Sequence, residues 1–150
     1  MNYTVKIDIS NCGYLAAYFA TKYNPGILEL PKNHLIHRKF VLILKSDDRF
    51  ITSYRENYIE IAIPQSDIID TRKFNKLSLN GEKEIIRTMR NEMWADFDDF
   101  AIKSSILSPT AIVYLFIEDH NLQVDTYDMF LKHLQRIPQN THKIRKKVAS

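Results

Sequence analysis

The sequence predicts an α+β fold: a small N-terminal sheet with one or two helices, followed by an all-helical C-terminal half that ends in a helix pair. Two patterns indicate this class. Residues 2–9 alternate polar and apolar side chains, the period of a strand with one buried face. After residue 78, apolar side chains recur at intervals of three and four, the period of a helix. A sheet-bearing front and a helical back in one short chain favour α+β.

The segment after the first strand predicts a helix and a second short strand. A helix is expected over 12–23, with a cap at Ser10 or Asn11 and a break at Pro25. Residues 27–30 form a short apolar stretch that is consistent with a strand.

The next elements are a helix and a hairpin. The apolar spacing in 31–45 favours a helix that starts at Pro31, although residues 40–44 would equally suit a buried strand. Residues 46–48 predict a turn, and residues 58–63 predict a strand that pairs with 49–54 in a hairpin.

The C-terminal half predicts three helices. Asn80 is the expected N-cap of the first, which carries one apolar stripe: Ile86, Met89, Met93, Phe97 and Phe100. Ser108 and Pro109 have the residue types that cap and start a second helix, over about 110–119. The last helix is expected over 125–136 and is ended by Pro138.

Length and composition predict one domain over 1–138 and a flexible basic tail over 139–150, because 150 residues suffice to bury a single core. Cys12 is the only cysteine, which excludes an internal disulfide and a zinc site built on thiols. The longest apolar run, 40–44, is too short to cross a bilayer. A cytoplasmic protein with no membrane partner is expected.

The positive charge of the chain is concentrated in its tail. The net charge is +3, and four cations of the tail account for more than this: Lys143, Arg145, Lys146 and Lys147. Without them the rest of the chain has a net charge of −1. Net basicity therefore does not indicate that the folded part binds nucleic acid.

Motifs of catalysis are missing from the sequence. It has no phosphate loop and no GxGxxG, HExxH or GxSxG pattern, so no catalytic residue, cofactor or enzymatic activity is predicted. The best acidic constellation is Glu92, Asp96 and Asp99, which share one helix face and would suit Mg²⁺ or Mn²⁺ in a nuclease. Because these acids lie beside the apolar stripe, a solvated helix surface is the favoured interpretation and no metal is predicted.

The histidines and the cysteine favour structural interpretations. His34 and His37 are three residues apart, but two ligands are too few for a metal and no partner carboxylate is identifiable, so both are interpreted as surface residues. His120 stands at a helix end, where it suits the helix dipole. Cys12 is expected to be a small half-buried residue, because no histidine partner can be named.

The two helices of 108–136 have the spacing of a helix-turn-helix, in which the second helix enters the major groove. That hypothesis assigns DNA contacts to Gln123, Thr126, Tyr127, Lys132, Gln135 and Arg136. Two features oppose it: the turn has no glycine, and the segment has four Asp and Glu against two Lys and Arg. A helix pair without any role in DNA binding would look the same.

Phosphate contacts would have to come from basic residues elsewhere in the chain. The candidates are Arg72, Lys73, Lys76, Lys83, Arg87 and Arg90, set against Glu82 and Glu84, together with the tail residues Lys143, Arg145, Lys146 and Lys147. Folding must bring them beside the helix pair for one surface to form.

Two stretches, YLAAYFATKYNPGILELPKNH (Tyr14 to His34) and AIVYLFIEDHNLQVDTYDMFLKHLQR (Ala111 to Arg136), carry a resemblance. The order of helix, short strand, Leu-Pro and terminal helix pair resembles small uncharacterised proteins of bacterial mobile elements and prophages, over about half of the chain. The resemblance implies a DNA-associated or regulatory role and transfers no site residue.

Two functional hypotheses follow. The first is a regulatory or accessory protein that binds double-stranded DNA through the helix pair and forms a homodimer through its front half. The second is a non-catalytic interaction or structural protein of a phage or mobile element, whose aromatic residues face a protein partner.

Overall fold

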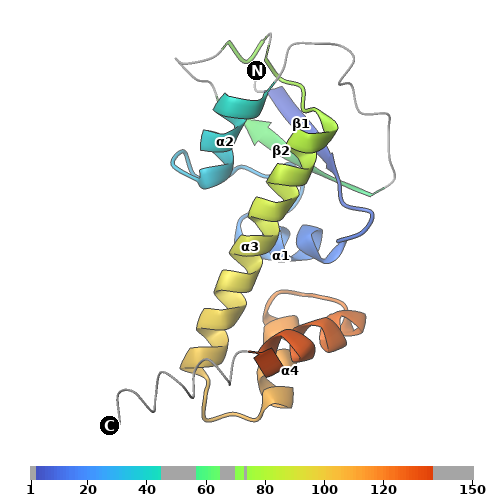
Figure 1. Ribbon diagram of the computed structural model, residues 1–150, viewed down its shortest axis with the longest axis vertical. Coiled ribbons are helices and arrows are strands. Elements are labelled where there is room, and N and C mark those ends of the chain that lie inside the picture. Colours follow the sequence, from blue (N-terminus) through green and yellow to red (C-terminus); the bar gives the residue numbers. More distant parts are fainter. Residues whose placement is uncertain (1–2, 45–56, 65–69, 73, 137–150) are drawn as a thin grey trace. The chain divides into compact units, whose positions relative to one another are not determined.

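The computed structural model describes residues 3–44, 57–64, 70–72 and 74–136 (Figure 1). In chain order the elements are β1 (Tyr3–Asp8), α1 (Tyr14–Lys22), α2 (Leu35–Ile43), β2 (Tyr58–Ile63), α3 (Leu79–Lys103), α4 (Pro109–Asp119), the 3₁₀ turn η2 (Val124–Thr126) and a helix over 127–136. A two-stranded sheet therefore precedes a helical half that ends in a helix pair, and the predicted α+β class is confirmed. The expected strand at 49–54, its turn, Pro138 and the tail lie outside the described residues.

The chain divides into two compact units, Met1–Glu92 and Met93–Ser150. Helix α3 contributes its residues up to Glu92 to the first unit and the remainder to the second. The expectation of one domain over 1–138 stays a prediction.

The sheet of the first unit pairs the two strands that the alternation predicts. β1 and β2 are antiparallel, with Val5 opposite Ile61 and Ile7 opposite Ile59. These four side chains are buried on one face. Lys6 and Glu60 are opposite each other on the other face, and there the Thr4 hydroxyl donates to Glu60 Oε1 at 2.6 Å.

The stretch 27–30 is a single bridge and not the strand that was expected. Leu28 pairs in parallel with Ile61, and the pairing goes no further among the described residues. The amide and the carbonyl of Leu28 face β2, where they bond to the carbonyl of Glu60 and the amide of Ala62. On the opposite edge, Asn24 Nδ2 donates to the carbonyl of Ile27 and Asn24 Oδ1 accepts from the amide of Glu29. The Asn24 side chain thus satisfies the backbone groups that point away from β2.

The helices of the first unit are present, but their caps differ from the predicted ones. The residue at the N-cap of α1 is Gly13, and the predicted caps Ser10 and Asn11 are not used. Ser10 instead donates its backbone amide to the carboxylate of Asp8. His34 caps α2, because its Nδ1 accepts from the amide of Ile36 at 3.0 Å. The helix therefore begins at Leu35, four residues after Pro31, and it continues to Ile43.

Helix α3 is amphipathic, and its buried stripe contains the predicted Met89, Met93 and Phe97 but differs from the prediction at both ends. Its N-cap is Ser78 and not Asn80, since the Ser78 hydroxyl accepts from the amide of Gly81. The fully buried positions are spaced by four: Ile85, Met89, Met93 and Phe97. Ile86 and Phe100, the predicted ends of the stripe, are half-buried.

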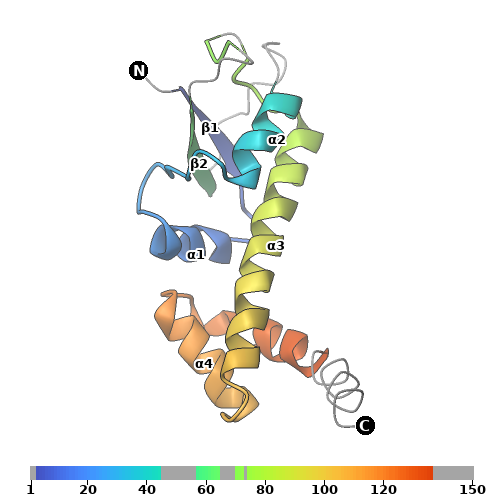
Figure 2. The same ribbon diagram turned by 90° about the vertical axis from the view of Figure 1, so that its left-hand side faces the viewer.

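In the first unit α1 and α2 both lie against α3 (Figures 1 and 2). Lys39 of α2 pairs with Glu84 of α3 at 2.5 Å, and Tyr23 at the end of α1 donates to Glu92 of α3 at 2.7 Å. The core between them and the sheet is built mainly from the large side chains Tyr18, Phe19, Phe40 and Leu15.

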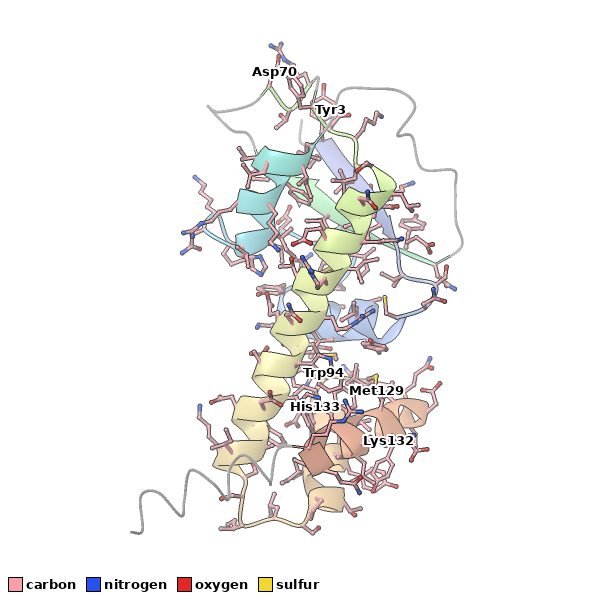
Figure 3. The ribbon with its side chains drawn as sticks, in the orientation of Figure 1. Tyr3, Asp70, Trp94, Met129, Lys132 and His133 are labelled. Atoms are coloured by element: carbon pink, nitrogen blue, oxygen red, sulfur yellow. The ribbon has the colours of Figure 1, made fainter. Side chains whose placement is uncertain are left out.

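The second unit has an aromatic core. The rings of Phe97, Phe116 and Phe130 lie with centroids 5.0 to 5.2 Å apart, which joins α3, α4 and the helix over 127–136. Trp94 and His133 stack at 4.0 Å (Figure 3), and His133 Nε2 lies 2.7 Å from Asp98 Oδ1. Ser108 caps α4 as predicted by accepting from the amide of Ala111.

In the described part of the chain no helix has the length and apolar character needed to cross a membrane.

His37 contradicts the interpretation of a surface histidine. It is 7 % exposed and packs against Phe40, and neither ring nitrogen has a hydrogen bond with good geometry to a described residue. Burial lowers the pKa of His37, the nearby His34 lowers it further, and the backbone of Lys32 acts in the opposite direction. The lowered pKa favours the neutral ring in the fold, and buried ring nitrogens without such a partner cost free energy.

Replacing His37 by leucine is expected to raise the free energy of unfolding by about 1 kcal/mol at pH 7.5, because a side chain of similar size without polar atoms fills the site. In the natural chain, stability falls with pH below about 6.5, where the unfolded state takes up the proton that folded His37 resists. His37→Leu should remove that part of the fall. Urea unfolding at pH 7.5 and pH 5.5 measures both effects.

His34→Leu is the matched control at the start of the same helix, and should lower stability because it removes a helix cap and a hydrogen bond to Glu92. Equal destabilisation by the two variants would contradict the different roles given to these histidines.

Candidate nucleic-acid interface

Three cations of the predicted phosphate-binding set lie on one face of α3. Lys83, Arg87 and Arg90 are all exposed, and their spacing of four and three residues places them on the side opposite the buried Ile85 and Met89. The exposed amides Asn80 and Asn91 fall on the same side. We call these five residues the basic face of α3.

Carboxylates neutralise this face only in part. Glu82 is 3 % exposed and accepts from the backbone of Asp8, so it does not share the surface with the cations. Glu84 binds Lys39 and Arg87, and the hydrogen bond from Lys39 lowers the pKa of Glu84, with Arg87 contributing in the same direction. No carboxylate among the described residues pairs with Lys83 or Arg90.

The other basic residues of the predicted set are dispersed. Arg72 is exposed and is bound to Asp70 at 3.2 Å, in the segment before α3 (Figure 3 labels Asp70). Lys76 is half-buried in the same segment. Lys73 lies outside the described residues, as do the tail residues Lys143, Arg145, Lys146 and Lys147.

The helix pair of the second unit exposes most of the predicted DNA-contacting residues. Gln123, Lys132, Gln135 and Arg136 are exposed. Thr126 is half-buried, and its hydroxyl donates to the carbonyl of Gln123 at 2.6 Å. Tyr127 is also half-buried, with its ring against Tyr114.

Residues 1–92 and residues 93–136 differ in the sign of their net charge. Residues 1–92 hold fourteen Lys and Arg against eleven Asp and Glu, a net charge of +3. Residues 93–136 hold three Lys and Arg against seven Asp and Glu, a net charge of −4. The basic face of α3 therefore belongs to a positive unit, and the helix pair belongs to a unit whose described part is negative.

Glu92 lies at the centre of a hydrogen-bonded cluster that sequence reasoning missed. Its Oε2 accepts from the Tyr23 hydroxyl at 2.7 Å and pairs with Lys22 at 3.1 Å, and its Oε1 lies 2.5 Å from His34 Nε2. Since His34 Nδ1 accepts from a backbone amide, the ring proton is on Nε2 and is donated to Glu92. The interpretation of Glu92 as part of a solvated surface is therefore wrong.

The chemistry of this cluster is structural. Burial acts to raise the pKa of Glu92, but the hydrogen bonds from Tyr23 and Lys22 outweigh it and the pKa is lowered. Burial and the bond to Glu92 raise the pKa of Tyr23, which keeps its proton. Both nitrogens of His34 are engaged, so none is left to take a proton from a substrate.

The remaining acidic residues and the cysteine do not form a reactive site. Asp99 pairs with Lys103 on the surface, and burial raises the pKa of Asp96. Within the described ranges no group of three or more His, Cys, Asp and Glu could hold a metal ion. Cys12 is buried and not half-buried as expected; burial raises the pKa of its thiol against the opposing effect of Arg90, so a reactive thiolate is disfavoured.

Two signals in the sequence would have revealed parts of this picture. Glu82, Glu92 and the buried stripe share one side of a helix, which marks these acids as candidates for buried pairing. His34 follows a Pro-Lys-Asn stretch directly before an apolar helical run, the position of an N-cap. The partners of Glu92 are 58 to 70 residues away in the chain, and no local pattern connects them.

Comparison of the chain with protein-family models, with curated proteins and with solved structures finds no match.

Glu92→Gln is expected to lower the free energy of unfolding by about 1–3 kcal/mol, because the cluster loses a charged acceptor that joins α1, α3 and the cap of α2. Asp99→Asn removes the same charge from an exposed pair on the same helix and should cost less than about 0.5 kcal/mol. Chemical unfolding at pH 7 compares the two. Equal losses would refute a structural role specific to Glu92.

Proposed function

We propose that this chain is a DNA-binding regulatory or accessory protein that contacts the phosphates of duplex DNA through the basic face of α3. The observation that carries the proposal is the exposure of Lys83, Arg87 and Arg90 on one side of one helix, in a unit with a net charge of +3.

The geometry of this face suits a phosphate backbone. Lys83 and Arg90 are seven residues apart, which is about 10 Å along the axis at about 1.5 Å per helical residue. One strand of duplex DNA presents a phosphate about every 3.4 Å along the axis, so three cations on this face match about three phosphates. Asn80 and Asn91 supply the amide groups that commonly donate to phosphate oxygens or base edges.

Arg87 and Lys39 share Glu84, which fixes the side chains at the edge of this face. No described carboxylate pairs with Lys83 or Arg90, although the Arg90 side chain also has a hydrogen bond with the thiol of Cys12. Because Glu82 is buried, only Glu84 opposes an approaching phosphate from this part of the helix.

The proposal does not rely on the helix pair of the second unit. DNA contacts by the helix pair stay a prediction, with these residues: Gln123, Thr126, Tyr127, Lys132, Gln135 and Arg136. The net charge of −4 over 93–136 opposes the binding of phosphate there. The tail residues and a homodimer of the front half are likewise predictions, as is the relationship to mobile-element proteins.

Lys83→Gln/Arg87→Gln/Arg90→Gln is expected to abolish or strongly weaken binding to a fluorescein-labelled 20-base-pair duplex of arbitrary sequence at about 50 mM salt. Three lost phosphate contacts should also reduce the slope of log affinity against log salt by about 2.7. Anisotropy titrations over a series of salt concentrations measure both quantities.

Lys132→Gln/Arg136→Gln is the matched control in the helix pair, and on this proposal it leaves the affinity almost unchanged. A larger loss from this control than from the triple variant would move the interface to the helix pair. If the natural chain does not bind duplex DNA at low salt, the proposal is wrong.

A further inference from the structure

The outward side of the helix pair in the second unit carries two tyrosines in contact. Tyr114 of α4 is 49 % exposed, and its ring lies 4.8 Å from that of the half-buried Tyr127. Neither phenol hydroxyl has a hydrogen-bond partner among the described residues. Core aromatics of this unit are buried in the cluster around Phe97, so this pair is not needed to complete that core.

Apolar side chains extend this surface on both helices. Leu115 lies next to Tyr114 on the outward face of α4, and Val124 lies one turn before Tyr127. They are 39 % and 69 % exposed. We call Tyr114, Tyr127, Leu115 and Val124 the tyrosine surface. Exposed apolar and aromatic side chains gathered in this way are typical of an interaction surface.

Unpaired carboxylates border the tyrosine surface. Glu118 is one turn along α4 from Tyr114, and Asp128 follows Tyr127 directly. With Asp119 and Asp125 they make four exposed carboxylates, and none of the four forms an ion pair with a described residue. The acids of α3 in the same unit differ, because Asp98 and Asp99 are bound by His133 and Lys103.

We propose that the tyrosine surface binds a peptide segment of a protein partner that carries Lys or Arg side chains beside an apolar residue. Charge complementarity identifies this occupant. A cation is attracted both to the faces of tyrosine rings and to the neighbouring carboxylates, and an apolar side chain of the peptide is matched by Leu115 and Val124. Nucleic acid is disfavoured here, because its phosphates would meet four carboxylates that no described cation neutralises.

This inference is independent of DNA binding through α3. It uses residues of the second unit alone, and the triple variant at Lys83, Arg87 and Arg90 should leave peptide binding unchanged. Failure of either proposal is therefore distinguishable from failure of the other.

Fluorescence anisotropy tests the inference with the full-length chain and a labelled peptide of about ten residues in which Lys and Arg alternate with Leu. The peptide should bind at about 50 mM salt, and binding should weaken as salt rises. A peptide with Glu in place of every Lys and Arg should not bind, and one with Ser in place of Leu should bind more weakly.

Variants locate the site. Tyr114→Ser should reduce the affinity about tenfold or more. Glu118→Gln/Asp128→Asn, which keeps the size of both exposed side chains and so preserves the fold, should reduce the affinity several-fold and flatten its salt dependence. Tyr3→Ser and Asp99→Asn are the matched controls, an exposed tyrosine and an exposed carboxylate elsewhere in the chain, and should leave it unchanged.

Three results would overturn the inference: no binding of the basic peptide by the natural chain, equal affinity in the Glu118→Gln/Asp128→Asn variant, or loss of duplex DNA binding on Tyr114→Ser. The last result would assign the surface to nucleic acid.

Discussion

The four-residue spacing of the buried side chains along α3 is the constraint on which both units depend. Ile85 and Met89 complete the core of the first unit, and Met93 and Phe97 belong to the core of the second. A helix that buries one side must expose the other. The burial of this stripe therefore exposes Lys83, Arg87 and Arg90 to solvent. The same spacing thus determines both the packing of the core and the positive charge on the exposed side of α3.

Glu92 shows how a charged residue can belong to that packing. Its carboxylate is engaged by Tyr23, Lys22 and His34, which come from the end of α1 and the cap of α2. A partly buried charge is tolerated when hydrogen bonds satisfy its oxygens. The cluster thus joins three helices of the first unit, and it engages the two nitrogens of His34 that a catalytic role would require.

Charge is distributed unevenly along the chain. Residues 1–92 have a net charge of +3 and include the basic face of α3, whereas residues 93–136 have a net charge of −4 and include the tyrosine surface with carboxylates that pair with no described residue. The two surfaces therefore favour ligands of opposite charge. The net charge of the whole chain conceals this difference, because the four cations of the tail offset the −4 of residues 93–136.

Strong periodicity made several elements predictable from the sequence: the strands β1 and β2, the long helix α3 and the helix pair capped at Ser108. These patterns arise from local geometry and from one buried side, so they are visible in one dimension. The predicted caps of α1 and α3 were wrong, and so was the strand at 27–30, where the described residues form a single bridge. Which polar residues are buried or paired became known from the tertiary structure alone. Glu82, His37 and Glu92 resemble surface residues in the sequence, and their burial depends on partners or neighbours far away in the chain, because an ion pair or a packed ring is a contact in space that no local spacing encodes.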